Sequence, residues 1–171
     1  MGGLDRAITG ALRNRHPAIP VTGRKRVASE LHTFVGASEE AFAVTVYLKN
    51  HHRDGDFNST LLMSKTKLAP TKTLSVVKVE LQAAQLGTQL ATYVGDSITQ
   101  PLVRRFFWVD NSCVRNWFRR IGEIQAATAP EELRYVPGGL NSSYLATRSS
   151  LISQEIPAVW FSGPEFLLFS A

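Results

Sequence analysis

The chain has 171 residues, 44% of them hydrophobic and 19% charged, which is enough for one ordinary globular core. A single cysteine, Cys113, excludes an internal disulfide, and the sequence lacks the Cys/His spacing of a zinc site. The net charge of +5 fits a polyanionic partner without requiring one. No apolar run reaches the ~18 residues that span a bilayer, so we expect no membrane partner and an intracellular location, cytoplasmic or nuclear.

The first half of the chain predicts a leader followed by three strands. Residues 1–29 combine prolines and basic side chains without an apolar period, which predicts a basic leader or linker. The strand pattern then appears three times, over Leu31–Val35, Ala41–Leu48 and Thr60–Ser64. Asp54-Gly55 is a strong turn signal between the second and third strands. Three successive strands with short connections predict an antiparallel meander.

The most regular pattern follows Ser75, which we expect to be a helix N-cap. The apolar residues recur at spacings of three and four and predict a long helix: Val79, Ala83, Leu86, Leu90 and Val94. The later elements are a fourth strand over Arg105–Val109, a helical stretch within Ser112–Gln125, a fifth strand over Leu133–Val136 and a helix over Ser142–Arg148.

This order predicts an α/β fold with one mixed five-stranded sheet flanked by helices. Helical crossovers place the fourth and fifth strands parallel to the first. Gly36 and Asp110 then follow neighbouring parallel strands, at the edge of the sheet where sites usually form. We expect one domain over residues 30–150 and a tail over residues 151–171 that packs on the domain or leaves it.

Several stretches together resemble a known family. They are ELHTFVGAS, KLAPTKTLSVVKVELQAAQLG, RRFFWVDNS, IGEIQAAT, RYVPGGLNSSYLATR and WFSGPEFL. Their order and spacing resemble the ribonuclease H-like domain that follows the reverse transcriptase in BEL/Pao-type LTR retrotransposon polyproteins. The resemblance runs from about Glu30 to about Leu167. It implies an RNase H-like fold, cleavage of the RNA strand of RNA/DNA hybrids, and the reverse transcriptase portion of the same polyprotein as a partner.

The resemblance also implies four acidic side chains that hold two Mg²⁺ or Mn²⁺ ions. Two-metal hydrolysis needs such a cluster because hard divalent cations take oxygen ligands and their charge must be balanced. The second and third acids of the family match Glu80 and Asp110. The first is replaced by Gly36 and the fourth by Tyr144, whose phenol would have to lose a proton with a pKa near ~10 before it could bind a cation. We therefore expect hydrolysis to be impaired or absent.

Each of these positions also has a plain structural explanation. Gly36 could end a strand because its backbone is permissive, and Glu80 could be a first-turn acid that the helix dipole favours. Asp110 could form a turn or cap the next helix. A hairpin tip that predicts a solvated loop, not a metal site, contains His51, His52, Asp54 and Asp56.

Basic and aromatic residues leave the nucleic-acid hypothesis open. The basic residues that could contact phosphates or simply face solvent are Lys65, Lys67, Lys72, Arg115, Arg119 and Arg120. The tryptophans could stack on bases, although core packing is favoured for the first: Trp108, Trp117 and Trp160. About a dozen residues usual in the family are missing after Arg119. An active nuclease, a non-catalytic module that binds nucleic acid or protein, and a decayed fragment without a selected role all remain as alternatives.

Overall fold

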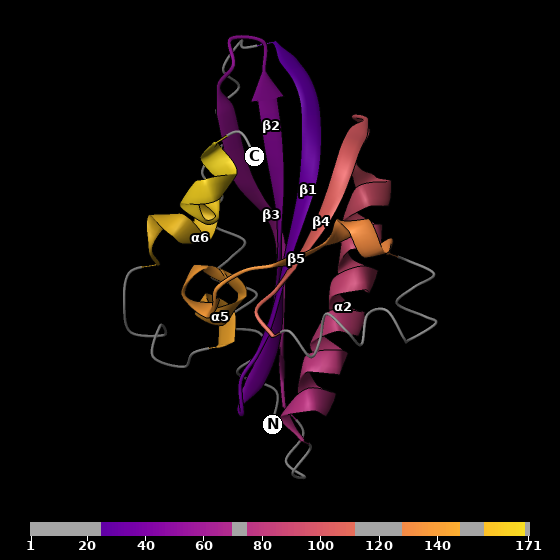
Figure 1. Ribbon diagram of the computed structural model, residues 1–171, viewed down its shortest axis with the longest axis vertical. Helices are drawn as coiled ribbons and strands as arrows, with labels where there is room; N and C mark the ends of the chain where they lie inside the picture. Colours follow the sequence, from indigo (N-terminus) through magenta and orange to yellow (C-terminus); the bar gives the residue numbers. More distant parts are fainter. Residues whose placement is uncertain (1–24, 70–74, 112–127, 148–155, 170–171) are drawn as a thin grey trace.

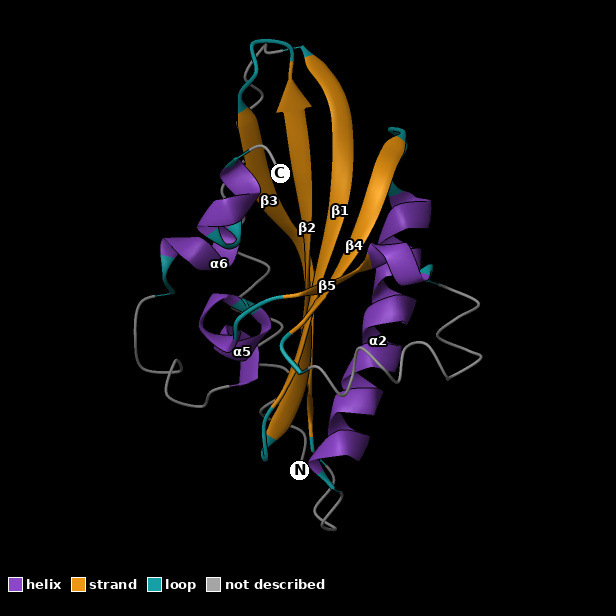
Figure 2. Ribbon diagram, viewed as in Figure 1, coloured by secondary structure: helices purple, strands orange, loops and turns teal. Residues whose placement is uncertain are grey.

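The computed structural model describes residues 25–69, 75–111, 128–147 and 156–169. Its described strands form one sheet in the order β3-β2-β1-β4-β5. They are β1 (Arg26–Ala37), β2 (Ala41–His52), β3 (Phe57–Leu68), β4 (Leu102–Val109) and β5 (Leu133–Tyr135). The long helix α2 (Val76–Ser97) covers one face of the sheet, and the short helices α5 (Ser143–Thr147) and α6 (Ala158–Ser162) cover the other (Figure 1, Figure 2).

The predicted strand directions are confirmed. β2 runs antiparallel to both β1 and β3, whereas β4 runs parallel to both β1 and β5. Val35 pairs with Val109, so Gly36 and Asp110 follow the same rung of neighbouring strands. The meander strands are longer than their apolar patterns because polar residues at their ends still pair through the backbone. β1 begins at Arg26, before the domain boundary expected at residue 30.

The apolar face predicted for α2 is confirmed, because this face contacts β1 and β2. All of its predicted apolar positions are buried there: Val79, Ala83, Leu86, Leu90 and Val94. The helix begins after Ser75, as predicted, but the Ser75 side chain makes no capping hydrogen bond. Instead the Ser75 carbonyl accepts a hydrogen bond from the Lys78 amide at 2.8 Å. None of the described helices is long and apolar enough to cross a membrane.

Two glycines of α2 have opposite surroundings, and neither has a positive φ. A methyl group on Gly87 would lie 2.7 Å from Cγ2 of Val35, whereas one on Gly95 would meet Cδ1 of Leu102 at 4.0 Å. We expect Gly87→Ala to lower the free energy of unfolding by about 1–3 kcal/mol, because overpacking pushes the helix off the sheet. Gly95→Ala, the matched control, should raise it by about 0.5–1 kcal/mol. Urea unfolding measures both, and equal effects would contradict a close approach at Gly87.

The second face of the sheet has its own small core beneath α6. The buried residues there are Phe34, Tyr47, Val136 and Leu167. Burial raises the pKa of Tyr47 to about 12, and its hydroxyl donates to the carbonyl of Trp160 at 3.0 Å. Trp160 is itself buried, so its indole belongs to the core and is not available to stack on bases. The C-terminal residues 156–169 therefore pack on the domain.

The hairpin between β2 and β3 turns at Asp54-Gly55, as predicted, and Gly55 has a φ of 88°. The prediction of a solvated loop is wrong for His51 and His52, which end β2 and are half-buried. His51 Nε2 lies 3.3 Å from Oε2 of Glu30 on the neighbouring strand. The local sequence could not show this contact because it depends on the pairing of β1 with β2.

Candidate active site

The four positions that the family resemblance singles out lie at one end of the sheet, where β1 and β4 finish between α2 and α5 (Figure 1). Gly36 is close to the end of β1, and Asp110 directly follows β4. Glu80 is on α2 and Tyr144 is on α5. The fold thus brings together residues that are spread over more than a hundred positions of the sequence.

Glu80 is held by an amide. It lies beyond the first turn of α2, so its explanation as a dipole-favoured first-turn acid is wrong. Both of its carboxylate oxygens accept hydrogen bonds from Nδ2 of Asn111, each at 2.8 Å. Burial raises the pKa of Glu80, the hydrogen bonds from Asn111 oppose this effect, and the negative charge of Asp110 adds to it. Asp110 therefore lies near enough to Glu80 to disfavour the charged form of Glu80.

Asn111 is a residue that the sequence patterns did not single out. It directly follows Asp110, so its place in the chain was a weak signal. Only the packing of α2 beside the end of β4 shows that its amide reaches Glu80.

The backbone conformation at position 36 does not require a glycine. Positive φ occurs among the described glycines only at Gly55 and Gly163, so Gly36 has an ordinary strand conformation, and it pairs with Ala43 of β2. The explanation that the strand needs a permissive backbone here is therefore wrong. A methyl group on Gly36 would overlap Oγ of Ser143, so the space beside the glycine is already filled by a side chain from α5.

Tyr144 and Asp110 flank the short 3₁₀ turn at Gly138–Leu140. A methyl group on Gly138 would lie 3.2 Å from Cε2 of Tyr144 and 3.6 Å from Oδ2 of Asp110. The ring of Tyr144 and the carboxylate of Asp110 therefore lie on the same side of Gly138. At this position it contributes an aromatic ring and a neutral hydroxyl in place of a negative charge.

These residues do not fit a pair of divalent ions. Two cations ~3.5–4 Å apart need several carboxylates in strict octahedral order. Of the four family positions only Glu80 and Asp110 carry a carboxylate, and both oxygens of Glu80 already accept hydrogen bonds. Within the described ranges no group of three or more His, Cys, Asp or Glu could hold a metal ion.

Two of the six predicted nucleic-acid contacts lie in the described part of the chain. Lys65 and Lys67 are exposed on β3. They pair with Val44 and Phe42, whose side chains pack under α2, so both lysines lie on the α2 face. Gly36 pairs with Ala43, between those two partners, which places the lysines two strands away from the candidate site. The other four predicted contacts lie outside the described residues: Lys72, Arg115, Arg119 and Arg120.

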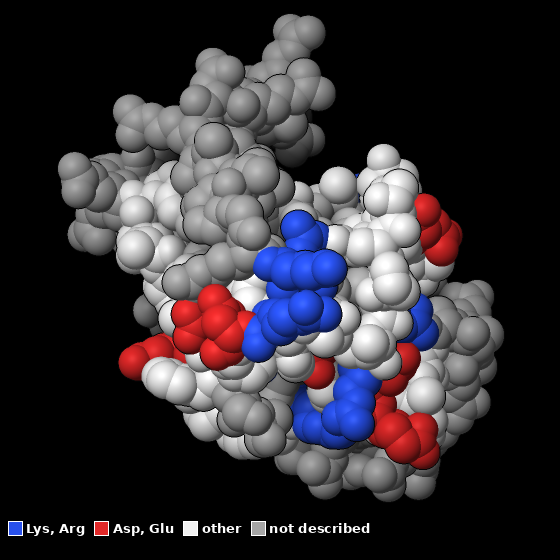
Figure 3. Space-filling model, turned by 90° about the horizontal axis from the view of Figure 1, so that it is seen from above, with Lys and Arg blue, Asp and Glu red and all other residues white. Residues whose placement is uncertain are grey.

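The opposite end of the molecule, near the β2–β3 turn, has a mixed charge. Seen from above, its described Lys and Arg side chains form separate groups with acidic side chains beside them (Figure 3). That end therefore offers no continuous basic surface among the described residues. Among the described residues, Lys65 and Lys67 on β3 remain the candidates for phosphate contact.

Trp108 is half-buried and packs against other aromatic side chains of the fold, as predicted. Its ring stacks on Phe34 at a centroid distance of 5.8 Å and packs against Phe166 at 4.9 Å. Its Nε1 donates to Nδ1 of His32 at 3.0 Å. Trp117 lies outside the described residues.

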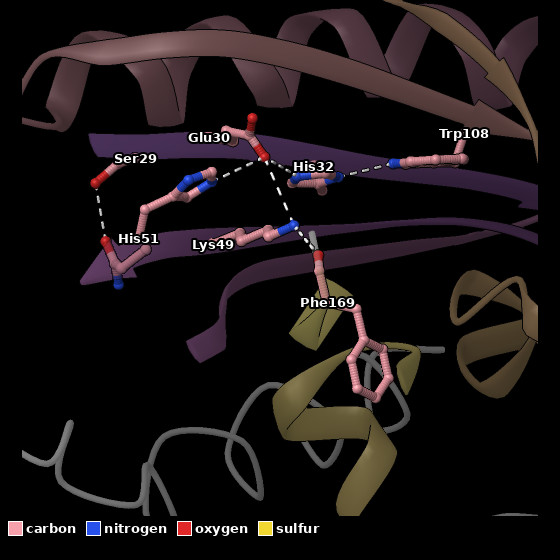
Figure 4. Close-up of polar contacts among 8 residues, drawn as sticks. Ser29, Glu30, His32, Lys49, His51, Trp108 and Phe169 are labelled. Carbon is pink, nitrogen blue, oxygen red and sulfur yellow. Dashed lines mark hydrogen bonds and ion pairs between the residues drawn. The ribbon is translucent and has the colours of Figure 1, made fainter. Parts of the chain in front are cut away.

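The bond from Trp108 connects it to a charged cluster on β1 and β2 (Figure 4). Because Nδ1 of His32 accepts this bond, Nε2 carries the proton and donates to Oε2 of Glu30 at 3.3 Å. Lys49 Nζ lies 3.9 Å from the same oxygen and donates to the carbonyl of Phe169 at 2.7 Å. The hydrogen bond from His32, aided by His51 and opposed by burial, lowers the pKa of Glu30 to about 2.

Sequence reasoning missed this charged cluster. Its only signal was that Glu30 and Lys49 flank runs predicted to be strands. The cluster joins the two strands and the C-terminal residues through charges that are largely withdrawn from water.

The strand order and the strand directions are those of an RNase H-like fold. The chain belongs to the family described as Pao retrotransposon-like RNaseH-like domain, whose model matches residues 14–111, more than half of the chain. The matched range includes Gly36, Glu80 and Asp110 and ends before Tyr144.

Solved structures similar to the chain include three RNase H domains of low sequence identity. The N-terminal RNase H domain of rv2228c from Mycobacterium tuberculosis, fused to maltose binding protein, is 13% identical with a TM-score of 0.40, covering 68% of this chain and 86% of that chain. RNase H1 from the halophilic archaeon Halobacterium salinarum NRC-1 is 9% identical with a TM-score of 0.37, covering 68% and 91%. LC11-RNase H1 in complex with an RNA/DNA hybrid is 13% identical with a TM-score of 0.34, covering 66% and 88%. No curated protein sequence matches the chain.

Proposed function

We propose that this chain is an RNase H-like domain of a retrotransposon polyprotein that keeps contact with nucleic acid but cleaves RNA/DNA hybrids poorly or not at all. Its ancestral role is removal of the RNA strand during reverse transcription, with the reverse transcriptase portion of the polyprotein as partner. We place it in the cytoplasm or nucleus. One observation carries the proposal: of the four family positions only Glu80 and Asp110 keep a carboxylate, and Asn111 Nδ2 donates hydrogen bonds to both oxygens of Glu80.

The charge at this site supports impaired hydrolysis. Two-metal hydrolysis stabilises both the attacking and the leaving oxygen of the phosphodiester, so it depends on a full set of carboxylates. Here two positions are neutral, and the pKa of Glu80 is raised by burial. Mg²⁺ or Mn²⁺ would find at most one weak site between Glu80 and Asp110.

The test is a cleavage assay of the purified chain on a labelled RNA/DNA hybrid with Mg²⁺ or Mn²⁺. We expect the amount of product to equal that from Asp110→Asn, the matched control that removes one of the two remaining acids. Rapid cleavage by the wild type that is lost in Asp110→Asn would show an active nuclease and contradict the proposal.

Hybrid binding by the same samples, followed by fluorescence anisotropy, tests the second half of the proposal. We expect the affinity to fall steeply as salt is raised, because Lys and Arg side chains displace counterions from the phosphates. Replacing Lys65 and Lys67 with alanine should weaken binding and reduce the slope of log K against log salt by roughly 2. A flat salt dependence would favour a protein-interaction module.

A further inference from the structure

Three consecutive polar residues at the start of α5 are buried. The exposed fractions of Asn141, Ser142 and Ser143 are 3%, 4% and 0%. Buried polar groups need hydrogen-bond partners, and two of these residues find theirs on the sheet. Asn141 Nδ2 donates to the carbonyl of Val35 at 2.9 Å, and Ser142 Oγ shares a hydrogen bond with Oγ1 of Thr45 at 3.1 Å.

Ser143 completes this arrangement. Its Oγ donates to Oδ1 of Asn141 at 2.7 Å, and its amide donates to the same oxygen at 3.2 Å. The two bonds hold the Asn141 side chain in the orientation that reaches Val35. The same hydroxyl lies where a Cβ on Gly36 would have to be, and that Cβ would also lie 3.4 Å from both Asn141 Nδ2 and Ser143 Cβ.

We propose that residues 141–143 form a neutral plug that fastens α5 to β1 and β2 and makes position 36 accept only glycine. Ser143 is the positioning residue, because its hydroxyl both orients Asn141 and fills the space of the missing side chain. Carboxylates gathered at such a place would repel one another without cations, whereas amide and hydroxyl groups need none. The plug is a proposal about packing, so its test does not depend on whether the chain cleaves hybrids.

The sign of one substitution tests the plug. Gly36 has no positive φ, so in open space Gly36→Ala would stabilise the chain by restricting the unfolded state. With the plug in place, we expect Gly36→Ala to lower the Tm by roughly 4–10 °C, the scale of an overpacked core in a domain of this size. In the Ser143→Ala background the same substitution should change the Tm by less than about 2 °C.

Gly139→Ala is the matched control, because a methyl group there meets nothing within 4 Å. Its Tm should stay within about 2 °C of the wild type. An unchanged or higher Tm for Gly36→Ala alone would overturn the proposal, since the Ser143 hydroxyl would then yield at no cost. If Gly36→Ala does not fold, the double variant decides: a cooperative melt supports the plug, and loss of the folded state contradicts it.

Discussion

The triple variant Gly36→Asp, Ser143→Ala and Tyr144→Asp is expected to cleave an RNA/DNA hybrid at least ~10²-fold faster than the wild type in Mg²⁺, the scale of one well-placed electrostatic group. The two new carboxylates would lie at the end of the sheet beside Glu80 and Asp110. Ser143→Ala is included because the serine hydroxyl fills the space that the first new side chain needs. Product is measured on a labelled hybrid at matched protein concentration.

Two controls distinguish the effect of the four carboxylates from the effect of the space that Ser143 fills. Gly36→Asp with Tyr144→Asp, but with Ser143 kept, should melt at a lower temperature and gain less activity than the triple variant. Adding Asp110→Asn to the triple variant should remove the gained activity. A folded triple variant that cleaves no faster than the wild type would mean that these four positions do not form a working site.

Glu30→Gln is expected to lower the free energy of unfolding by about 3–5 kcal/mol at pH 7, because it leaves a buried cation without its counter-charge. The side chains of Glu30 and Lys49 are only 12% and 4% exposed. Urea unfolding gives the measurement. The double variant Glu30→Gln with Lys49→Met removes both charges and should recover part of the loss. A loss below about 1 kcal/mol for Glu30→Gln would place the pair among weak surface ion pairs.

The same cluster predicts a loss of stability in acid. Burial lowers the pKa of His32 from its ordinary 6.5, so the unfolded chain takes up that proton first and stability falls as the pH drops below 6.5. The pKa of Glu30 is lowered from 4.5 to about 2, so the stability that its carboxylate contributes is present above pH 4.5 and is lost between 4.5 and 2. Glu80, with a raised pKa, acts in the opposite direction.

Comparing the wild type with Glu30→Gln therefore isolates the loss of stability between pH 4.5 and 2 that is due to Glu30. We expect the wild type to lose stability in both pH ranges and the variant to lack most of the lower one. Unfolding free energies of the wild type that stay constant between pH 7 and 5 would contradict the buried, neutral state of His32.

The sequence predicted the architecture well because the architecture depends on local patterns. Strand runs, the turn at Asp54-Gly55 and the apolar face of α2 all repeat within a few residues, and the crossover rule then fixes the strand directions. The position of Gly36 beside Asp110 follows from those directions alone.

What the sequence could not predict depends on contacts between distant residues. The bond between Thr45 and Ser142 joins residues 97 positions apart, and the bond from Trp108 to His32 joins residues 76 apart. No local pattern reveals that a serine hydroxyl lies against Gly36. The explanations of Gly36 by a permissive backbone and of Glu80 as a first-turn acid are wrong for the same reason, because each considers only neighbours in the chain.

The attachment of the C-terminal residues to β2 bears on how the chain is made. β2 leaves the ribosome well before the partners of Tyr47 and Lys49, because Trp160 and Phe169 lie 113 and 120 positions later in the chain. Until these partners emerge, the part of β2 around Tyr47 and Lys49 lacks its native contacts on that face. Nascent chains stalled ahead of Ala158 should therefore remain sensitive to protease, however complete the rest of the sheet has become.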